Sequence, residues 1–147
     1  MQIHLHQRVS LRQAAVAALE NGQIVPWYQP QLCSDTGRVT GFEALARWEH
    51  PKRGIIPPQD FLKALEDNGQ LEHLCEAMLQ GAFQALANWD KSGLKIDSVG
   101  VNFTQEDLRS PNLVDRIKWE LDRFDLAADR LCIEILEVCR GSAHPTI

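Results

Sequence analysis

Three stretches of the chain have the apolar patterns that are typical of β-strands. Residues 39 to 48 alternate strictly between two faces. One face carries Phe42, Ala44, Ala46 and Trp48, and the other carries Gly41, Glu43, Leu45 and Arg47. Residues 99 to 103 (VGVNF) and 131 to 137 (LCIEILE) are shorter runs that are rich in β-branched residues. The pattern predicts three strands, and it places a glutamate and an arginine on one face of the first.

Helical patterns separate these strands. A capping box at Ser10 and Gln13 predicts a helix that ends near Gly22. A short helix is expected over residues 61 to 66, a long amphipathic one over 71 to 89, and a further one over 110 to 124 after a cap-then-proline start. The helices between the strands predict βα repetition and a mainly parallel sheet.

One more strand-like stretch, Ile24 to Leu32, precedes the first of these three. It contains Pro26 and Pro30. Because proline cannot donate to a strand ladder, this stretch is expected to be an edge strand or to pair atypically.

Composition adds mainly exclusions. With 147 residues, of which 44% are hydrophobic, the chain is long enough to bury one core. Its 15 basic and 20 acidic residues give a net charge of −5, which argues against a nucleic-acid polymer as partner. No apolar stretch approaches the ~20 residues that span a bilayer, and the first residues lack a signal-peptide core. We therefore expect a cytoplasmic protein without membrane contact.

Oxygen-bearing side chains recur where the predicted strands end. Glu43, Asn102 and Glu134 each lie in one of the three strands, and parallel strands bring their carboxyl ends to one edge. Oxygen ligands of this kind suit Mg²⁺, Mn²⁺ or Ca²⁺ better than zinc. Each residue alone has a simpler interpretation: a solvated glutamate or a Glu43–Arg47 pair, a turn asparagine, and a surface glutamate.

Taken together, the residues resemble the EAL domain, the bacterial cyclic di-GMP phosphodiesterase family. The matching blocks are residues 27–31 (WYQPQ), 43–45 (EAL), 47–51 (RWEHP) with Gly54, Pro57, Pro58 and Phe61, 101–104 (VNFT) and 134–137 (EILE). A single EAL triplet is weak, but five blocks in the family's order are specific. The resemblance implies a TIM-like barrel whose first strand runs antiparallel to the rest and whose carboxyl face binds cyclic di-GMP.

The resemblance also implies roles for individual residues. The metal ligands would be Glu43, Asn102 and Glu134. Gln29 and Arg47 would contact the dinucleotide, and Glu137 would steady a neighbouring active-site loop. Two Mg²⁺ or Mn²⁺ ions would activate a water and neutralise charge on the phosphodiester, and the planar guanidinium of Arg47 suits a phosphate.

Later motifs of the family have no counterpart in this sequence. The family carries an Asp-Asp pair, a Lys and a further Glu on later strands, and the residues after Glu137 contain none of them. We therefore expect an α/β fold that is a partial TIM-like barrel of about four strands. Residues 1–9 are expected to form a tail, residues 10–139 a truncated EAL domain and residues 140–147 a second tail.

Three hypotheses follow for function. The first is a cyclic di-GMP phosphodiesterase relative that is catalytically inactive as this chain, with metal and ligand binding weak or lost. The alternative is a degenerate EAL module that binds ligand or protein without turnover, and the last is an enzyme assembled from two chains. Because an unfinished barrel leaves open edges and an apolar inner face, including Leu45, Val101 or its neighbours, and Ile133 or Leu136, we also expect a homodimer.

Overall fold

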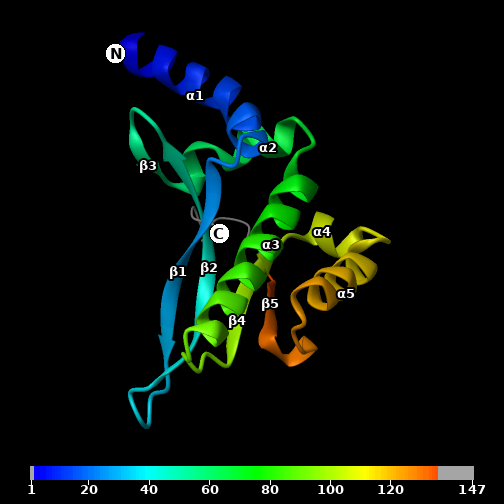
Figure 1. Cartoon of the computed structure of the whole chain (residues 1–147). Coiled ribbons are helices and arrows are strands. Elements are labelled where there is room, and N and C mark those ends of the chain that lie inside the picture. Colours follow the sequence, from blue (N-terminus) through cyan, green and yellow to red (C-terminus); the bar gives the residue numbers. More distant parts are fainter. Residues whose placement is uncertain (1, 136–147) are drawn as a thin grey trace.

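A single sheet with helices along one face forms the centre of the molecule (Figure 1). The computed structural model describes residues 2–135, and the side-chain surroundings of residues 11–135. The helices are α1 (Gln2–Glu20), α2 (Leu62–Asp67), α3 (Leu71–Lys91), α4 (Gln105–Arg109) and α5 (Leu113–Phe124), with 3₁₀ turns η1 (Pro58–Asp60) and η2 (Ala128–Arg130). The strands are β1 (Ile24–Leu32), β2 (Val39–His50), β3 (Gly54–Ile56), β4 (Ser98–Phe103) and β5 (Leu131–Ile135).

The sheet is mixed, and its strand order is β1-β2-β4-β5 with β3 paired to β2. β1 runs antiparallel to β2, whereas β2, β4 and β5 run parallel to one another. This confirms the predicted antiparallel first strand over residues 24–32. Pro26 and Pro30 lie on β1, which is an edge strand of the described sheet, where the missing N–H groups cost least.

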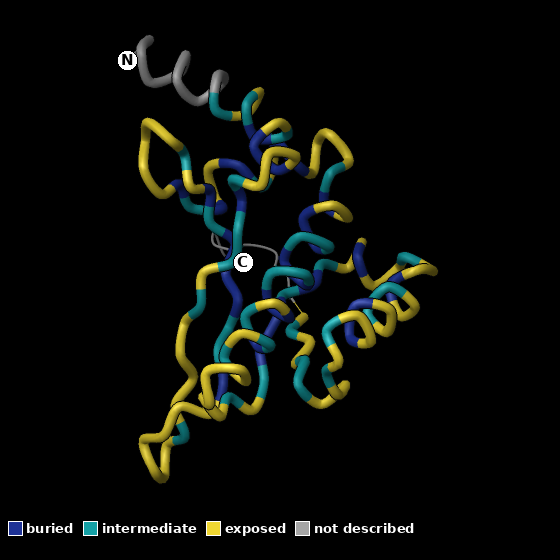
Figure 2. The backbone as a smooth tube through the Cα atoms, viewed as in Figure 1, coloured by how far each residue is buried: buried dark blue, intermediate teal, exposed yellow. Residues whose placement is uncertain are grey.

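Helix α3 covers one face of the sheet and fills the core. It packs across β1, β2 and β4, and α5 lies beside it and packs against it (Figure 2). The apolar stripe of α3 is buried, with Leu79, Phe83 and Leu86 fully inaccessible. Close approach of β1 is possible at Gly81, because a Cβ there would lie 2.6 Å from Cγ of Pro26. The Tyr28 hydroxyl of β1 donates to the Gly81 carbonyl oxygen at 3.0 Å. No helix in the described part of the chain is long and apolar enough to cross a membrane.

Some element boundaries differ from the predictions. The first helix begins at Gln2, so the capping box predicted at Ser10 lies inside a helix. No glycine or proline separates residues 2 to 10, so nothing in this stretch ends the helix. Two short elements, β3 and α4, were not predicted. Helix α4 begins with a capping box between Thr104 and Asp107.

Two of the residues named for the open inner face, Val101 and Ile133, lie on the other side of the sheet, and the alternative Leu136 lies outside the described residues. Asn102 pairs with Glu134 in the β4–β5 register, and Val101 pairs with Ile133 one position earlier. Because neighbouring residues of a strand point to opposite faces, Val101 and Ile133 lie on the helix-facing side of the sheet. Val101 is accordingly only 1% exposed and belongs to the core, whereas Ile133 is 46% exposed. Leu45 does share the face of Glu43, as predicted, and is buried there.

Candidate functional site

The face of the sheet opposite α3 brings three predicted residues together. In the β2–β4 register Glu43 lies beside Gly100, two residues before Asn102, and Asn102 lies beside Glu134. The Asn102 side chain donates from Nδ2 to Oε1 of Glu43 at 3.2 Å. All three residues are half-buried. Two carboxylates and an amide from three adjacent strands therefore share one surface.

A glycine on the middle strand allows the two carboxyl groups to approach. Gly100 separates Glu43 on β2 from β5, and a Cβ at Gly100 would lie 2.7 Å from Oε1 of Glu134. The Glu134 carboxyl group therefore lies over Gly100, on the side of Glu43. Gln31 of β1 reaches across the same face and donates from Nε2 to Oε1 of Glu134 at 3.3 Å.

This arrangement raises the pKa of the Glu134 carboxyl above its ordinary value. The largest cause is burial, followed by a hydrogen bond with the Glu43 carboxyl group and repulsion from its charge, while the Gln31 hydrogen bond opposes them. The charge of Glu43 that contributes to this rise also favours a divalent cation, which relieves the repulsion between the two carboxyl groups. The donor set of two carboxylates and one amide oxygen fits Mg²⁺ or Mn²⁺.

The remaining predicted site residues lie at different distances from this cluster. Gln29 of β1 lies directly opposite Glu43 and is exposed. Arg47 shares the face of Glu43 but follows it by four residues, about 13 Å along an extended strand, and its Nη1 donates to the Ala46 carbonyl oxygen at 2.7 Å. Glu137 lies outside the described residues.

One placement was wrong in detail. Glu43 does not lie near the end of its strand, because β2 continues to His50. β2 pairs with β4 only as far as Ala44, but it continues to His50 because it also pairs with β1 and β3. Asn102 does precede the last residue of its strand, as predicted, and Glu134 precedes Ile135, the last described residue of β5.

Two contributors to this cluster were missed from the sequence. Gln31 lies two residues after Gln29 and therefore on the same face, so period-two alternation could have found it. Gly100 lies two residues before Asn102 on the site face, but only the register shows that Glu134 lies over it. Within residues 11–135 no three side chains of the His, Cys, Asp and Glu types form a candidate metal cluster, so the set depends on the amide of Asn102.

The chain is therefore an α/β protein. Its mixed sheet has an antiparallel first strand, and one face of the sheet carries oxygen side chains that are compatible with a divalent cation. A sequence model of the EAL domain matches residues 9–145, and the chain belongs to this family. MucR of Pseudomonas aeruginosa, a bifunctional diguanylate cyclase/cyclic di-GMP phosphodiesterase, is 31% identical over 137 residues. PdeR of Escherichia coli, a cyclic di-GMP phosphodiesterase, is 32% identical over 122 residues. The solved PaMucR phosphodiesterase in complex with c-di-GMP superimposes with a TM-score of 0.78 at 32% identity.

The chain is much shorter than these relatives. The matched region is 93% of this chain but 20% of MucR, and 83% of this chain but 18% of PdeR. For the solved PaMucR structure the match covers 84% of this chain and 50% of that chain.

Proposed function

We propose that this chain carries the Glu43–Asn102–Glu134 part of a metal-dependent cyclic di-GMP phosphodiesterase site. The contact of these side chains on adjacent strands is the observation that supports it most directly. Mg²⁺ or Mn²⁺ would be held by the oxygens of these three residues. When bound, such a cation supplies Lewis-acid chemistry to a phosphodiester and to an attacking water.

Residues around the cluster would bind the dinucleotide. Gln29 pairs with Glu43 in the β1–β2 register, which supports a contact between its amide and a ligand at the proposed cation. Arg47 lies further along the same face, where its planar guanidinium would donate to a phosphate or a base edge. Glu137 would steady a neighbouring loop. The bound cyclic di-GMP of the PaMucR complex supports this choice of ligand.

The sheet would be part of a TIM-like (β/α) barrel formed by residues 10–139. A closed barrel surrounds its ligand with loops from eight strands, whereas four strands supply one wall. The described face also offers two carboxylates, fewer anionic oxygens than two divalent cations need. We therefore propose that residues 1–147 alone are catalytically inactive. A cytoplasmic location stays a prediction.

The first prediction concerns turnover and binding by this chain alone. With Mg²⁺ or Mn²⁺, no linear dinucleotide above that of a Glu43→Gln control is expected from cyclic di-GMP. Because one wall encloses little of the ligand, the dissociation constant should be on the order of 0.1 mM or weaker. Chromatographic product analysis and calorimetry measure the two quantities. Linear product that disappears in Glu43→Gln would refute the inactivity.

The alternative is a binding module that retains the ligand without turnover. The placement of Gln29 and Arg47 on the face of the carboxylates is the observation that favours it. It would bind cyclic di-GMP with submicromolar affinity and without hydrolysis. Such an affinity, lost in Arg47→Ala, would favour the binding module over an inactive phosphodiesterase relative.

The second prediction is self-association as a homodimer, through the open face or an edge of the sheet. Of the two edges of the described sheet, β1 is protected by Pro26 and Pro30, whereas β5 contains no proline. Ile133 and Ile135 on β5 are 46% and 60% exposed. Sedimentation velocity at micromolar concentration should show a dimer that Ile133→Lys weakens. A monomer at all concentrations would contradict this prediction.

A further inference from the structure

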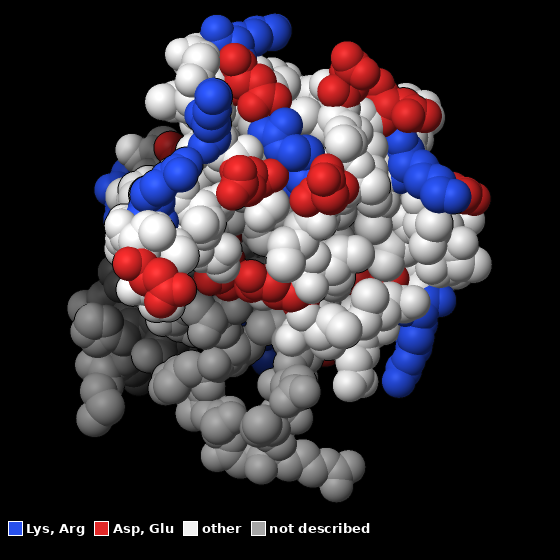
Figure 3. Space-filling model, turned by 90° about the horizontal axis from the view of Figure 1, so that it is seen from below, with Lys and Arg blue, Asp and Glu red and all other residues white. Residues whose placement is uncertain are grey.

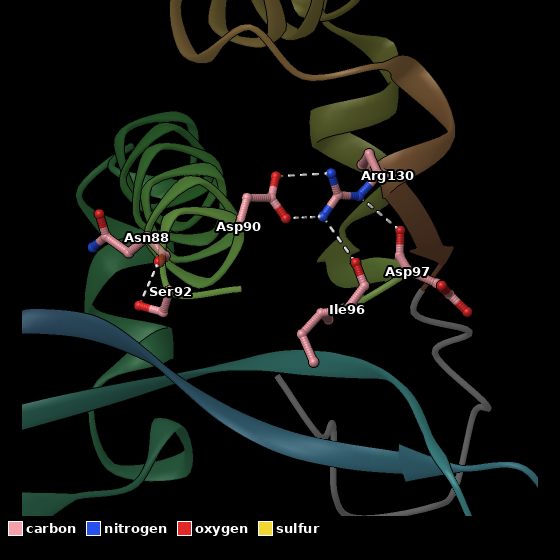
Figure 4. A network of polar contacts seen from close by, with 6 residues as sticks. All are labelled: Asn88, Asp90, Ser92, Ile96, Asp97 and Arg130. Atoms are coloured by element: carbon pink, nitrogen blue, oxygen red, sulfur yellow. Dashed lines mark hydrogen bonds and ion pairs between the residues drawn. The ribbon is translucent and has the colours of Figure 1, made fainter. Parts of the chain in front are cut away.

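An arginine immediately before β5, Arg130, joins three segments of the chain (Figure 4). It precedes the strand that carries Glu134 near its other end. The Arg130 guanidinium donates from Nη1 and Nη2 to the two carboxylate oxygens of Asp90, at 3.0 and 2.9 Å. Nη2 also donates to the Ile96 carbonyl oxygen at 2.8 Å, and Nε donates to that of Asp97 at 2.9 Å. Asp90 lies in the last turn of α3, and Ile96 and Asp97 directly precede β4. We call these four residues the Arg130 clasp.

The Arg130 clasp lies next to the first residue pair of the β4–β5 ladder. Leu131, the residue after Arg130, pairs with Val99 in the first position of the β4–β5 ladder. Asp97 is in turn held to β2, because its backbone N–H donates to the Thr40 carbonyl oxygen at 3.2 Å. A chain of contacts therefore runs from β2 through the start of β4 to the start of β5, level with the first ladder pair.

Within the described residues, β5 is also held by the core packing of Leu131, the Gln31–Glu134 hydrogen bond and the ladder with β4. It is a five-residue strand that pairs with β4 alone, and Cys132, Ile133 and Ile135 are exposed. A slip by one residue would turn Glu134 to the opposite face. A slip by two would move its carboxyl group about 7 Å along the strand, away from Glu43.

From this geometry we propose that Arg130 is a positioning residue for the carboxylate site, because it sets the register of β5 and so holds Glu134 beside Glu43. The inference rests on the proposed metal site and deepens it. Arg130 lies four residues before Glu134, about 13 Å along the strand, so it acts through β5 and not by contact with a ligand.

The groups around Arg130 explain why an arginine suits this position better than a lysine. The side chain of Arg130 is 22% exposed, and that of Asp90 is 42% exposed. A lysine would present a single nitrogen, whereas the planar fork bonds a carboxylate and two carbonyl groups at once. Hydrogen bonding to Arg130 lowers the pKa of Asp90, so the pair stays charged well below neutral pH.

On the molecular face at this end, basic and acidic side chains are interspersed and do not form separate positive and negative patches (Figure 3). That distribution is consistent with local pairing and not with a surface for a charged partner.

The third prediction compares Arg130→Gln and Arg130→Lys with Arg116→Gln in the full chain. The control also removes an arginine–carboxylate pair, between Arg116 of α5 and Glu72 of α3, but it does not touch β5. Amide hydrogen exchange by NMR reports β5, the Asn102 side-chain amide signal reports the site, and Mn²⁺ titration reports affinity. Arg130→Gln should accelerate exchange across Leu131–Ile135 at least tenfold, shift the Asn102 signal and weaken Mn²⁺ binding at least fivefold.

The variants distinguish positioning from general destabilisation. Arg116→Gln should leave the position of the Asn102 signal unchanged and the Mn²⁺ dissociation constant within twofold of the parent value. This should hold even if Arg116→Gln lowers the melting temperature as much as Arg130→Gln does. Arg130→Lys should give an intermediate loss. An unchanged Asn102 signal and β5 exchange in Arg130→Gln, or equal effects of the control, would overturn the proposal. If the parent chain shows no Mn²⁺ binding that depends on Glu43, as tested with Glu43→Gln, the metal site is rejected. The exchange of β5 and the Asn102 signal would then still decide the role of Arg130.

Discussion

Replacing Trp48 with alanine is expected to destabilise the fold by about 3–5 kcal/mol, a large part of the 5–15 kcal/mol that holds a typical domain together. Trp48 is 1% exposed, and its ring packs edge-on against Phe61 with 6.1 Å between ring centroids. Its Nε1 donates to Oε1 of Gln23 at 3.2 Å, so removal leaves both a cavity and an amide without this partner. The melting temperature should fall by about 10 °C.

Trp119→Ala is the matched control for this prediction. Trp119 lies on α5, is 61% exposed, and has the Arg123 guanidinium 5.8 Å from its ring centroid. A cation–π contact at such a site contributes about 0.5–1 kcal/mol, so the melting temperature should fall by less than about 4 °C. Calorimetric melting of both variants measures the difference. Similar losses in the two variants would show that Trp48 is not a central part of the core.

Glu43→Gln is expected to change metal affinity and stability in opposite directions. Glutamine keeps an oxygen for the Asn102 hydrogen bond but removes one of two carboxylates, so Mn²⁺ affinity should fall at least tenfold. Without metal, the variant should be more stable at pH 7 by a few tenths to about 1 kcal/mol, or about 1–4 °C, because like charges no longer face each other.

The pH dependence of this gain follows from the raised pKa of Glu134. An acid whose folded pKa exceeds its unfolded value costs stability above the folded pKa and costs none below the unfolded one. The advantage of Glu43→Gln should therefore be present at pH 7 and vanish as Glu134 becomes protonated toward pH 4. Melting scans across this range, with Glu66→Gln as an exposed control on α2, check the sign. A variant less stable than the parent at pH 7, with undiminished Mn²⁺ binding, would contradict the paired-carboxylate site.

Local patterns along the chain predicted most of the elements that build the site. Strict alternation assigned Glu43 and Leu45 to one face of β2, and the long apolar stripe predicted α3 over residues 71–89, close to its observed extent. These predictions succeed because the period of side chains along one strand or helix depends on that element alone. The EAL motifs added the family and the antiparallel β1, which the register confirms.

Contacts between distant residues were decided only by the tertiary structure. Gln31 meets Glu134 across 103 residues of sequence, and Arg130 meets Asp90 across 40. Which face of β4 turns to the helices was likewise decided by how β4 packs against α3, and this packing buries Val101. The sequence by itself determined which residues are candidate oxygen ligands and on which strands they lie. The packing of β4 and β5 decided that Glu134 lies over Gly100 beside Glu43, because register between separate strands is a property of the assembled sheet.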